Sequence, residues 1–220
     1  MALEEPKFKQ LERYLRPTLT IDCDNDAIRK KARSLAEAYE ENADKAKSIF
    51  YFVRDEISYD PYSFLPLEAS RILKRGAGYC VQKAILLVAL ARAIKIPARL
   101  GFADVRNHIM PEKLAEVAGM QGNNLFPYHG YAEFYVGGRW VKATPAFDLK
   151  MCQESRVIPV EFDGKNDAIF HSHNLDGQLH IEYVCFHGHY ADVPVDKIVN
   201  ATVRVYGVNV VERWKRGFLE

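Results

Sequence analysis

Residues 76–97 read GAGYCVQKAILLVALARAIKIP, and this stretch indicates how the rest of the chain folds. The run from about Tyr79 to Ile94 is apolar and long enough for a buried helix. Two glycines precede this run and make the approach to it flexible. After Pro97 the pattern changes to the alternation of apolar and polar residues that is typical of a strand. Cys80 therefore stands at the entrance of a predicted helix.

The composition of the 220-residue chain is that of a globular protein. Hydrophobic residues make up 48% and charged residues 27%, which argues against a disordered or low-complexity chain. The formal net charge is +1, so the totals give no electrostatic reason to expect nucleic acid or a membrane as a partner. No apolar run approaches the roughly 18 residues of a membrane-spanning helix, and we see no signal peptide. We therefore expect a cytoplasmic protein whose cysteines are free thiols.

The order of the predicted elements indicates an α+β fold. Helical spacing covers residues 24–58 as two helices, a short helix near 69–73, the helix 79–94, another short helix at 111–119 and the tail 194–218. Strand patterns cover residues 98–105, 129–136, 139–143, 157–162 and 180–186. Because most helices come before most strands, we expect N-terminal helices packed on an antiparallel sheet. No linker divides the chain, so we treat residues 1–220 as a single domain.

Cys80 is the first candidate for a catalytic residue. The N-terminus of a helix presents unpaired backbone N–H groups and the positive end of the helix dipole, and both stabilise a thiolate. We therefore expect a lowered pKa and a nucleophilic sulfur at Cys80. The same N–H groups can stabilise an oxyanion beside the sulfur. The alternative interpretation is a buried structural cysteine at a helix start.

His129 is the second candidate, because it begins a strand on a polar face. Period-two alternation in HGYAEFYV places His129, Tyr131 and Glu133 on one face, and Ala132 and Phe134 on the other. The next two residues are glycines, which indicate a two-residue hairpin turn. The surroundings predicted for His129 are unlike those of a packed core histidine.

Several motifs together carry a family resemblance. They are Gly78-Tyr79-Cys80, Ala91-Arg92-Ala93, Ile96-Pro97-Ala98-Arg99, the strand His129-x-aromatic-x-Glu133, and Gly138-Arg139-Trp140-Val141. In this order the chain resembles the transglutaminase-like superfamily of papain-fold cysteine enzymes, over roughly residues 45–148. The resemblance implies a papain-like/transglutaminase-like core followed by an extension at residues 150–220. It also implies that Cys80 is the nucleophile and that His129 is its base.

The third member of the expected catalytic group departs from the family pattern. The family usually places an aspartate four residues after the tryptophan, and this chain has Thr144 there. A threonine hydroxyl can accept a hydrogen bond from an imidazole but cannot stabilise an imidazolium as a carboxylate does. The hairpin register makes Asp148 a diagonal neighbour of His129 on the same face, so we expect Asp148 to orient the ring. The alternative interpretation of Asp148 is an N-cap for a helix at 149–154.

Three further sets of residues complete the predicted site. Tyr79, beside the nucleophile, and Tyr131, on the face of His129, are the expected substrate-binding residues, while Gln82 is expected to be structural. By the hairpin register, Glu133 faces Lys142, which predicts an ion pair. The histidines within residues 171–189 have spacings that could suit zinc or copper, but we do not favour a metal site. We expect no metal, no calcium requirement and no cofactor.

The resemblance and the Cys80–His129 pair predict an enzyme. We expect attack on an amide or acyl bond through a thioester, on a peptide, protein or small amide substrate. A hydrolase (a peptidase or amidase) is slightly favoured over an acyltransferase, because the chain is compact. The alternative is a non-catalytic binding protein that keeps the transglutaminase-like fold, as the Thr144 departure suggests. The sequence does not indicate an oligomeric state.

Overall fold

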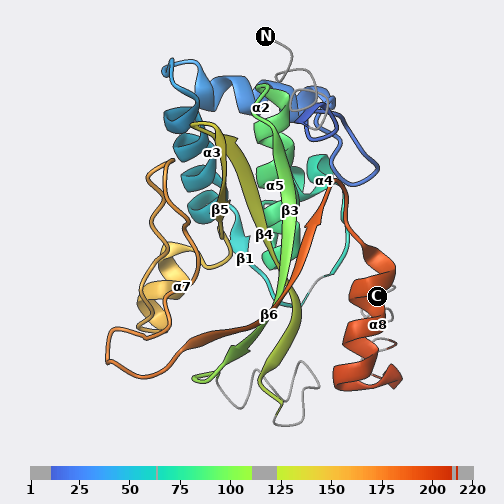
Figure 1. The fold of residues 1–220 in the computed structure, drawn as a ribbon, viewed down its shortest axis with the longest axis vertical. Coiled ribbons are helices and arrows are strands. Elements are labelled where there is room, and N and C mark those ends of the chain that lie inside the picture. The colour runs from blue at the N-terminus through green and yellow to red at the C-terminus, as the bar shows by residue number, and fades with distance from the viewer. Residues whose placement is uncertain (1–10, 63, 111–122, 210–211, 213–220) are drawn as a thin grey trace.

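The helical layer of the protein is built around one central helix. The computed structural model describes residues 11–62, 64–110, 123–209 and 212. The helices of this layer are α2 (Asp26–Ala36), α3 (Asn42–Glu56), α4 (Ala69–Arg75) and α5 (Cys80–Ala93). Figure 1 shows α5 at the centre, behind the sheet and beside α3. The prediction of helices over the first part of the chain is confirmed, and Asn25 caps α2 by accepting from the Ala27 N–H at 2.9 Å.

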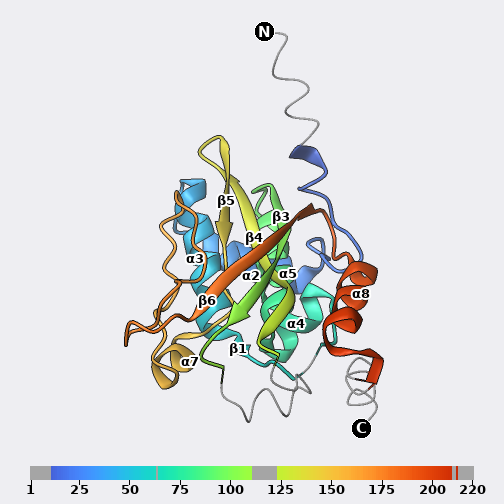
Figure 2. The same cartoon turned by 60° about the horizontal axis from the view of Figure 1, so that its bottom comes forward.

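A four-stranded antiparallel sheet forms the second layer. Its strands are β3 (Ala98–Asn107), β4 (Leu125–Val136), β5 (Arg139–Ala143) and β6 (Ile181–Tyr190), in the spatial order β5-β4-β3-β6. In Figure 2 the edge strand β6 runs at an angle to the other strands, with α7 (Leu149–Glu154) on the left and α8 (Val195–Tyr206) on the right. The predicted α+β class with an antiparallel sheet is therefore confirmed.

The connection into α5 is held by a second, small sheet. Strand β1 (Ser58–Tyr59) pairs in parallel with β2 (Ala77–Gly78), which ends two residues before Cys80. Gln82 secures the same turn, because its Oε1 accepts from the Tyr79 N–H at 3.0 Å and its Nε2 donates to the Pro66 carbonyl at 2.8 Å. The approach to the helix is thus fixed by hydrogen bonds, and the structural role expected for Gln82 is confirmed.

The predicted hairpin register is correct within β4 and β5. Ala132 faces Ala143, and Glu133 faces Lys142. The predicted Glu133–Lys142 ion pair is nevertheless wrong. Glu133 instead accepts from Arg99 at 2.6 Å, on the neighbouring strand β3, and Lys142 pairs with Asp167 at 2.8 Å. Glu133 and Lys142 each have a partner of opposite charge on another segment, so no ion pair forms between these two residues.

Two other predicted elements, a strand and a helix, are not confirmed. The predicted strand at 157–162 is wrong, because this segment is irregular even though Val160 and Phe162 are buried. Its backbone is satisfied by side chains: the Val160 carbonyl accepts from Arg54 at 2.7 Å, and the Phe162 carbonyl lies 3.3 Å from the Tyr51 hydroxyl. The predicted helix at 111–119 lies outside the described residues.

Among the described residues, no helix combines the length and the apolar character that a membrane crossing requires.

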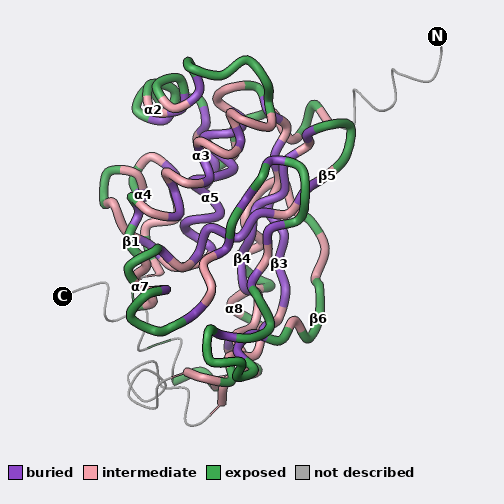
Figure 3. The backbone as a smooth tube through the Cα atoms, turned by 90° about the vertical axis from the view of Figure 1, so that its left-hand side faces the viewer, coloured by how far each residue is buried: buried purple, intermediate pink, exposed green. Residues whose placement is uncertain are grey.

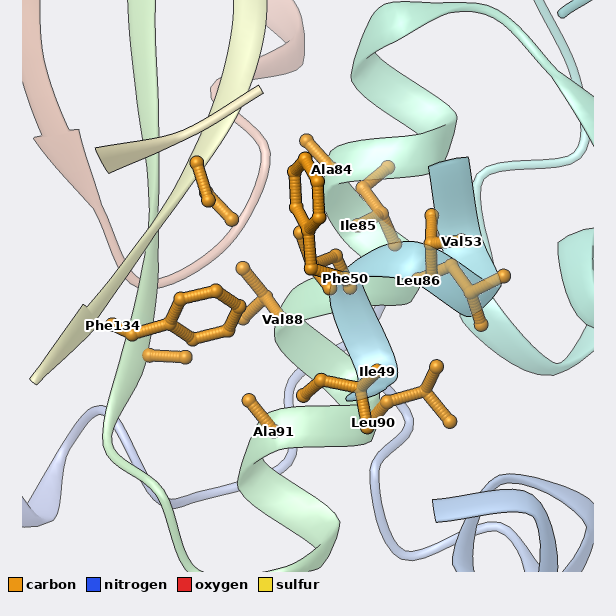
Figure 4. Packing of buried hydrophobic residues seen from close by; sticks show 14 of the residues in the cluster. Ile49, Phe50, Val53, Ala84, Ile85, Leu86, Val88, Leu90, Ala91 and Phe134 are labelled. Atoms are coloured by element: carbon orange, nitrogen blue, oxygen red, sulfur yellow. The ribbon is translucent and has the colours of Figure 1, made fainter. Parts of the chain in front are cut away.

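The hydrophobic core surrounds α5 on every side. All residues from 81 to 92 of this helix are buried, and the buried segments of Figure 3 converge on it. Figure 4 shows Ile49 and Phe50 of α3 and Phe134 of β4 packed against Val88 and its neighbours on α5. Burial on all faces explains why the helix has no polar stripe. It also holds the first residue of the helix in one position relative to the sheet.

The contact between α5 and β4 is closest at Gly130. A Cβ atom built on Gly130 would lie 2.8 Å from the Val81 Cα, which is closer than two carbon atoms approach in a packed interior. Only a residue without a side chain therefore lets the strand pass the start of the helix at this distance. Val81 follows Cys80 in the chain and Gly130 follows His129, so this contact brings those two residues together.

We predict that Gly130→Ala destabilises the protein. The added methyl group must push the strand and the helix apart, and overpacking of this kind costs about 1–3 kcal/mol. Urea denaturation of the variant and the parent protein measures the difference in the free energy of unfolding.

The double variant Gly130→Ala/Val81→Ala is the control for this prediction. It removes the Val81 side-chain atom that lies 3.0 Å from the built Cβ but leaves the backbone obstruction. We therefore expect the double variant to remain less stable than Val81→Ala alone. Full recovery of stability would show that only the side chain, and not the backbone, limits the approach.

Candidate active site

Cys80 is the first residue of α5, and its thiol is surrounded by backbone N–H groups. Burial raises the pKa of the Cys80 thiol to about 11, and hydrogen bonds from the backbone of Gly130, Val81 and Cys80 itself lower it by less. The lowered pKa expected for Cys80 is therefore wrong. The helix start supplies the N–H groups as predicted, but the loss of water around the sulfur outweighs them.

His129 lies in β4 with only 4% of its surface exposed. Burial lowers the pKa of the imidazole to about 3, so the ring is neutral at physiological pH. Its aromatic neighbours are Phe170, at a centroid distance of 4.9 Å, and Tyr183, at 6.3 Å. The Nε2 atom is buried and has no hydrogen-bond partner. A neutral imidazole with a free nitrogen is chemically able to accept a proton.

Cys80 and His129 line one cavity of about 140 Å³. They flank the Gly130–Val81 contact, which places them at the same end of the interface between helix and sheet. No hydrogen bond between these two described side chains is present in the structure. Catalytic hydrogen bonds are often long before substrate binds and shorten in the complex. The arrangement therefore has the two groups that acyl transfer by a cysteine requires, on one surface.

Thr144 and Asp148 do not contact His129 through hydrogen bonds. The Thr144 hydroxyl is buried near Tyr183 but has no hydrogen-bond partner that meets the usual distance and angle. Asp148 is the N-cap of α7: its Oδ1 accepts from the Met151 N–H and its Oδ2 from the Tyr59 N–H, both at 2.8 Å. The interpretation of Asp148 as an N-cap is thus confirmed. Its role in orienting His129 stays a prediction.

The chain leaves the sheet before it reaches Asp148. Strand β5 ends at Ala143, and the Thr144 N–H donates at 2.8 Å to the Ala168 carbonyl of a later segment. The predicted register around His129 is therefore wrong, because the hairpin pairing does not continue beyond Ala143. Asp148 loses the diagonal position that the extended register would have given it.

The two tyrosines predicted to bind substrate have different positions. Tyr79 lines the cavity, with its ring 4.9 Å from that of Phe64. Tyr131 is not among the residues that line the cavity. Its ring covers Gly101 on the neighbouring strand, where a built Cβ would lie 2.3 Å from the ring, and only 1% of Tyr131 is exposed. The structure therefore supports the predicted position of Tyr79 but not that of Tyr131.

Several aromatic residues that the sequence analysis missed line the cavity. Tyr59 and Phe147 pack edge to face at 5.2 Å, and Phe147 stacks on Phe170 at 4.6 Å. Tyr128, directly before His129, lines the cavity from β4. The clustering of proline and aromatic residues around 59–66 and 126–128 was the one signal in the sequence that could have indicated them.

The histidines of the segment 171–189 do not form a metal site in the described part of the chain. No group of three or more histidine, cysteine or acidic side chains there could hold a metal ion. His187 pairs instead with Asp104 at 2.7 Å and His189 with Glu133 at 3.1 Å. Burial lowers the pKa of His180 to about 4. His187 and His189 therefore act as hydrogen-bonding groups on β6, and His180 is a buried packing group.

Comparison with solved structures shows a related fold. A candidate cysteine protease from Cytophaga hutchinsonii aligns with a TM-score of 0.53 and 19% identity, over 83% of this chain and 47% of the other. The periplasmic domain of TgpA from Pseudomonas aeruginosa aligns with a TM-score of 0.46 and 16% identity, over 62% of this chain and 46% of the other. The chain thus spans about half the length of each of these proteins. Among curated proteins, none matches it.

The family assignment rests on a match to a family model. The model of the transglutaminase-like superfamily matches residues 29–145, which is more than half of the chain and includes both Cys80 and His129. The order of the motifs, the helix that begins at the cysteine and the antiparallel sheet that carries the histidine agree with this match. The chain therefore belongs to the transglutaminase-like superfamily.

Proposed function

We propose that the protein is a cysteine enzyme that cleaves an amide or related acyl bond through a thioester. The observation that carries this proposal is that Cys80 and His129 share one cavity, with backbone N–H groups directed at the sulfur. The family and the name of the Cytophaga hutchinsonii protein support a cysteine-type activity.

The first step follows from the protonation states of the two groups. Cys80 is a neutral thiol and His129 a neutral imidazole, since burial moves the two pKa values apart. The Cys80 sulfur attacks the acyl carbon while His129 accepts the thiol proton, so little charge is created before the bond forms. The backbone N–H groups that contact the sulfur donate to the oxygen of the tetrahedral intermediate. His129 then returns the proton to the leaving amine, and the thioester remains.

Water completes the reaction in the function that we favour. His129 takes a proton from the water molecule, the water oxygen attacks the thioester carbon, and the Cys80 thiol is released as the acid product forms. An amine in place of water would give acyl transfer by the same steps. The Cytophaga hutchinsonii protein, described as a protease, favours a hydrolase over an acyltransferase.

A non-catalytic binding protein is the second candidate. Two observations favour it: Thr144 stands where the family usually has an aspartate, and the buried His129 Nε2 has no partner to orient it. In that case the cavity would hold a ligand that forms no covalent bond to Cys80. The acylation experiment below distinguishes the two functions.

We predict that p-nitrophenyl acetate transfers its acetyl group to Cys80, as detected by intact-protein mass spectrometry and peptide mapping. The Cys80→Ala variant should form no adduct at position 80. The His129→Gln variant should be acylated about 10²–10⁴-fold more slowly, which is the typical contribution of a general base.

Two exposed residues provide matched controls for this experiment. His171→Gln and Cys185→Ser change the same residue types outside the cavity, and both residues are exposed. These variants should acylate Cys80 at the parent rate. Equal rates for His129→Gln and the parent protein would exclude the proposed base and favour the binding function.

We predict that the rate of Cys80 acylation is nearly constant between about pH 5 and pH 9. The lowered pKa of His129, about 3, keeps the base neutral in this range, and the raised pKa of Cys80, about 11, keeps the thiol protonated. An acid limb near the ordinary imidazole pKa of about 6.5 would contradict the buried, neutral His129.

Circular dichroism at each pH is the control for the pH profile. In the unfolded chain His129 binds a proton below about pH 6.5, whereas in the folded protein it binds one only near pH 3. Stability from this group is therefore present above pH 6.5 and decreases as the pH falls, by up to about 1.4 kcal/mol per pH unit. Rates are to be compared only where the protein remains folded.

We predict that Asp148→Ala lowers the free energy of unfolding by about 0.5–2 kcal/mol, the usual cost of losing an N-cap. If Asp148 acts only through α7 and Tyr59, the acylation rate of the folded variant should change little and its pH profile should keep its shape. If Asp148 orients His129, the rate should fall strongly and Asp148→Asn should not restore it, because an amide cannot stabilise the imidazolium. Urea denaturation and the acylation assay separate the two roles.

A further inference from the structure

The size of the cavity beside Cys80 matches a single aromatic ring. Its volume is about 140 Å³, and an apolar cavity of about 150 Å³ engineered into another protein binds benzene. A methyl group would leave most of this space unfilled, and a fused pair of rings needs more space than a single ring. The volume thus matches a single aromatic ring best.

The wall of the cavity excludes charge. Among the described residues that line it, none is Asp, Glu, Lys or Arg, and most are aromatic or aliphatic. A charged group placed there would lose its hydration without gaining an ion pair, at a large cost in free energy. An apolar group of phenyl size, in contrast, gains affinity when it is fully buried. The chemistry of the wall therefore selects for uncharged, apolar groups.

Tyr128 closes one side of the cavity, and its backbone is held in an unusual conformation. Its φ angle is +53°, in the left-handed region that non-glycine residues rarely adopt. The Tyr128 N–H donates to Asp104 Oδ1 at 3.0 Å, and the same oxygen pairs with His187 Nε2 at 2.7 Å. The His187 ring stacks on the Tyr128 ring, with 4.1 Å between centroids and 4° between planes. The backbone and the ring of Tyr128 are thus held by the side chains of Asp104 and His187.

This clamp of Asp104 and His187 joins three separate segments. Asp104 lies at a register shift of β3, His187 is in β6, and Tyr128 is in β4. A strained residue persists only where its surroundings over-determine it. Because the neighbouring residue is His129, the clamp fixes the wall of the cavity relative to the proposed base.

We infer that the cavity is a preformed subsite for an uncharged apolar group, about the size of a phenyl ring, adjacent to the scissile carbonyl, and that Tyr128 sets its width. This inference rests on the proposed function, since it names the class of substrate that Cys80 and His129 act on. Specificity then comes from apolar fit beside the nucleophile.

Aldehydes with different side chains test the inference. The Cys80 sulfur adds to the aldehyde carbon, the C=O π bond breaks and the oxygen takes the thiol proton, so no leaving group affects the comparison. The probes are acetaldehyde, phenylacetaldehyde, 2-naphthylacetaldehyde and succinic semialdehyde, which carries a carboxylate. Their inhibition constants are measured as protection of Cys80 from acylation by p-nitrophenyl acetate.

We predict that phenylacetaldehyde binds about 10- to 100-fold more tightly than acetaldehyde, as expected from burying a phenyl group. Succinic semialdehyde and 2-naphthylacetaldehyde should bind no more tightly than acetaldehyde. If all four bind within threefold of one another while acylation still depends on His129, the subsite is wrong and the proposed function stands. If Cys80 is not acylated, the proposed function fails, and toluene binding measured by NMR then tests the cavity without chemistry.

Variants of Tyr128 test its role as the residue that sets the width. Tyr128→Gly keeps a residue that tolerates a positive φ but removes the ring, so 2-naphthylacetaldehyde should gain at least tenfold in affinity relative to phenylacetaldehyde. Tyr128→Phe should restore the parent preference, because it keeps the ring. Tyr39→Gly, at an exposed tyrosine, is the matched control and should leave all four affinities unchanged. An unchanged preference in Tyr128→Gly would overturn the role of Tyr128.

Discussion

The approach of Gly130 to Val81 is the contact on which the site depends. It lets β4 pass the first turn of α5 without an intervening side chain. The helix cannot adjust its position, because all of its residues from 81 to 92 are buried. The strand cannot move away, because it is paired with β3 on one side and β5 on the other. Cys80 and His129 each precede one partner of this contact, so the rigidity of the core is passed directly to the two residues of the proposed site.

Burial determines the chemistry of these groups more than the helix dipole does. The backbone hydrogen bonds to the Cys80 sulfur act in the direction expected for a helix start, yet the pKa of the thiol is raised to about 11. The same dry surroundings lower the pKa of His129 to about 3. A preformed thiolate–imidazolium pair would need the pKa of the thiol to lie below the pKa of the imidazole. In the proposed mechanism, the site therefore favours proton transfer during attack, when the charge develops where N–H groups can stabilise it.

The sequence predicted the parts of the protein that depend on local patterns. Period-two alternation and a glycine pair are sufficient for the hairpin of β4 and β5, and a long apolar run is sufficient for α5. Strand β5 ends before Thr144, where the Thr144 N–H donates to the Ala168 carbonyl, far along the chain. No local pattern in the sequence indicates this hydrogen bond. Tyr131 has the predicted face, but a glycine on the adjacent strand lets its ring lie flat over β3, away from the cavity. Local patterns thus pointed to Cys80 and His129, which line one cavity, whereas long-range contacts decided the surroundings of these two residues.

The orientation of His129 illustrates what packing supplies in place of a hydrogen bond. A carboxylate bonded to the ring would fix both its angle and its tautomer. Here the buried Nε2 has no partner, so no acceptor selects a tautomer. The ring is nevertheless confined, because Phe170 and Tyr183 lie against it and only 4% of the residue is exposed. Phe170 in turn stacks on Phe147. The aromatic wall that shapes the cavity is therefore also what holds the proposed base. In the proposed function, the fit of the substrate and the position of the base thus depend on the same residues.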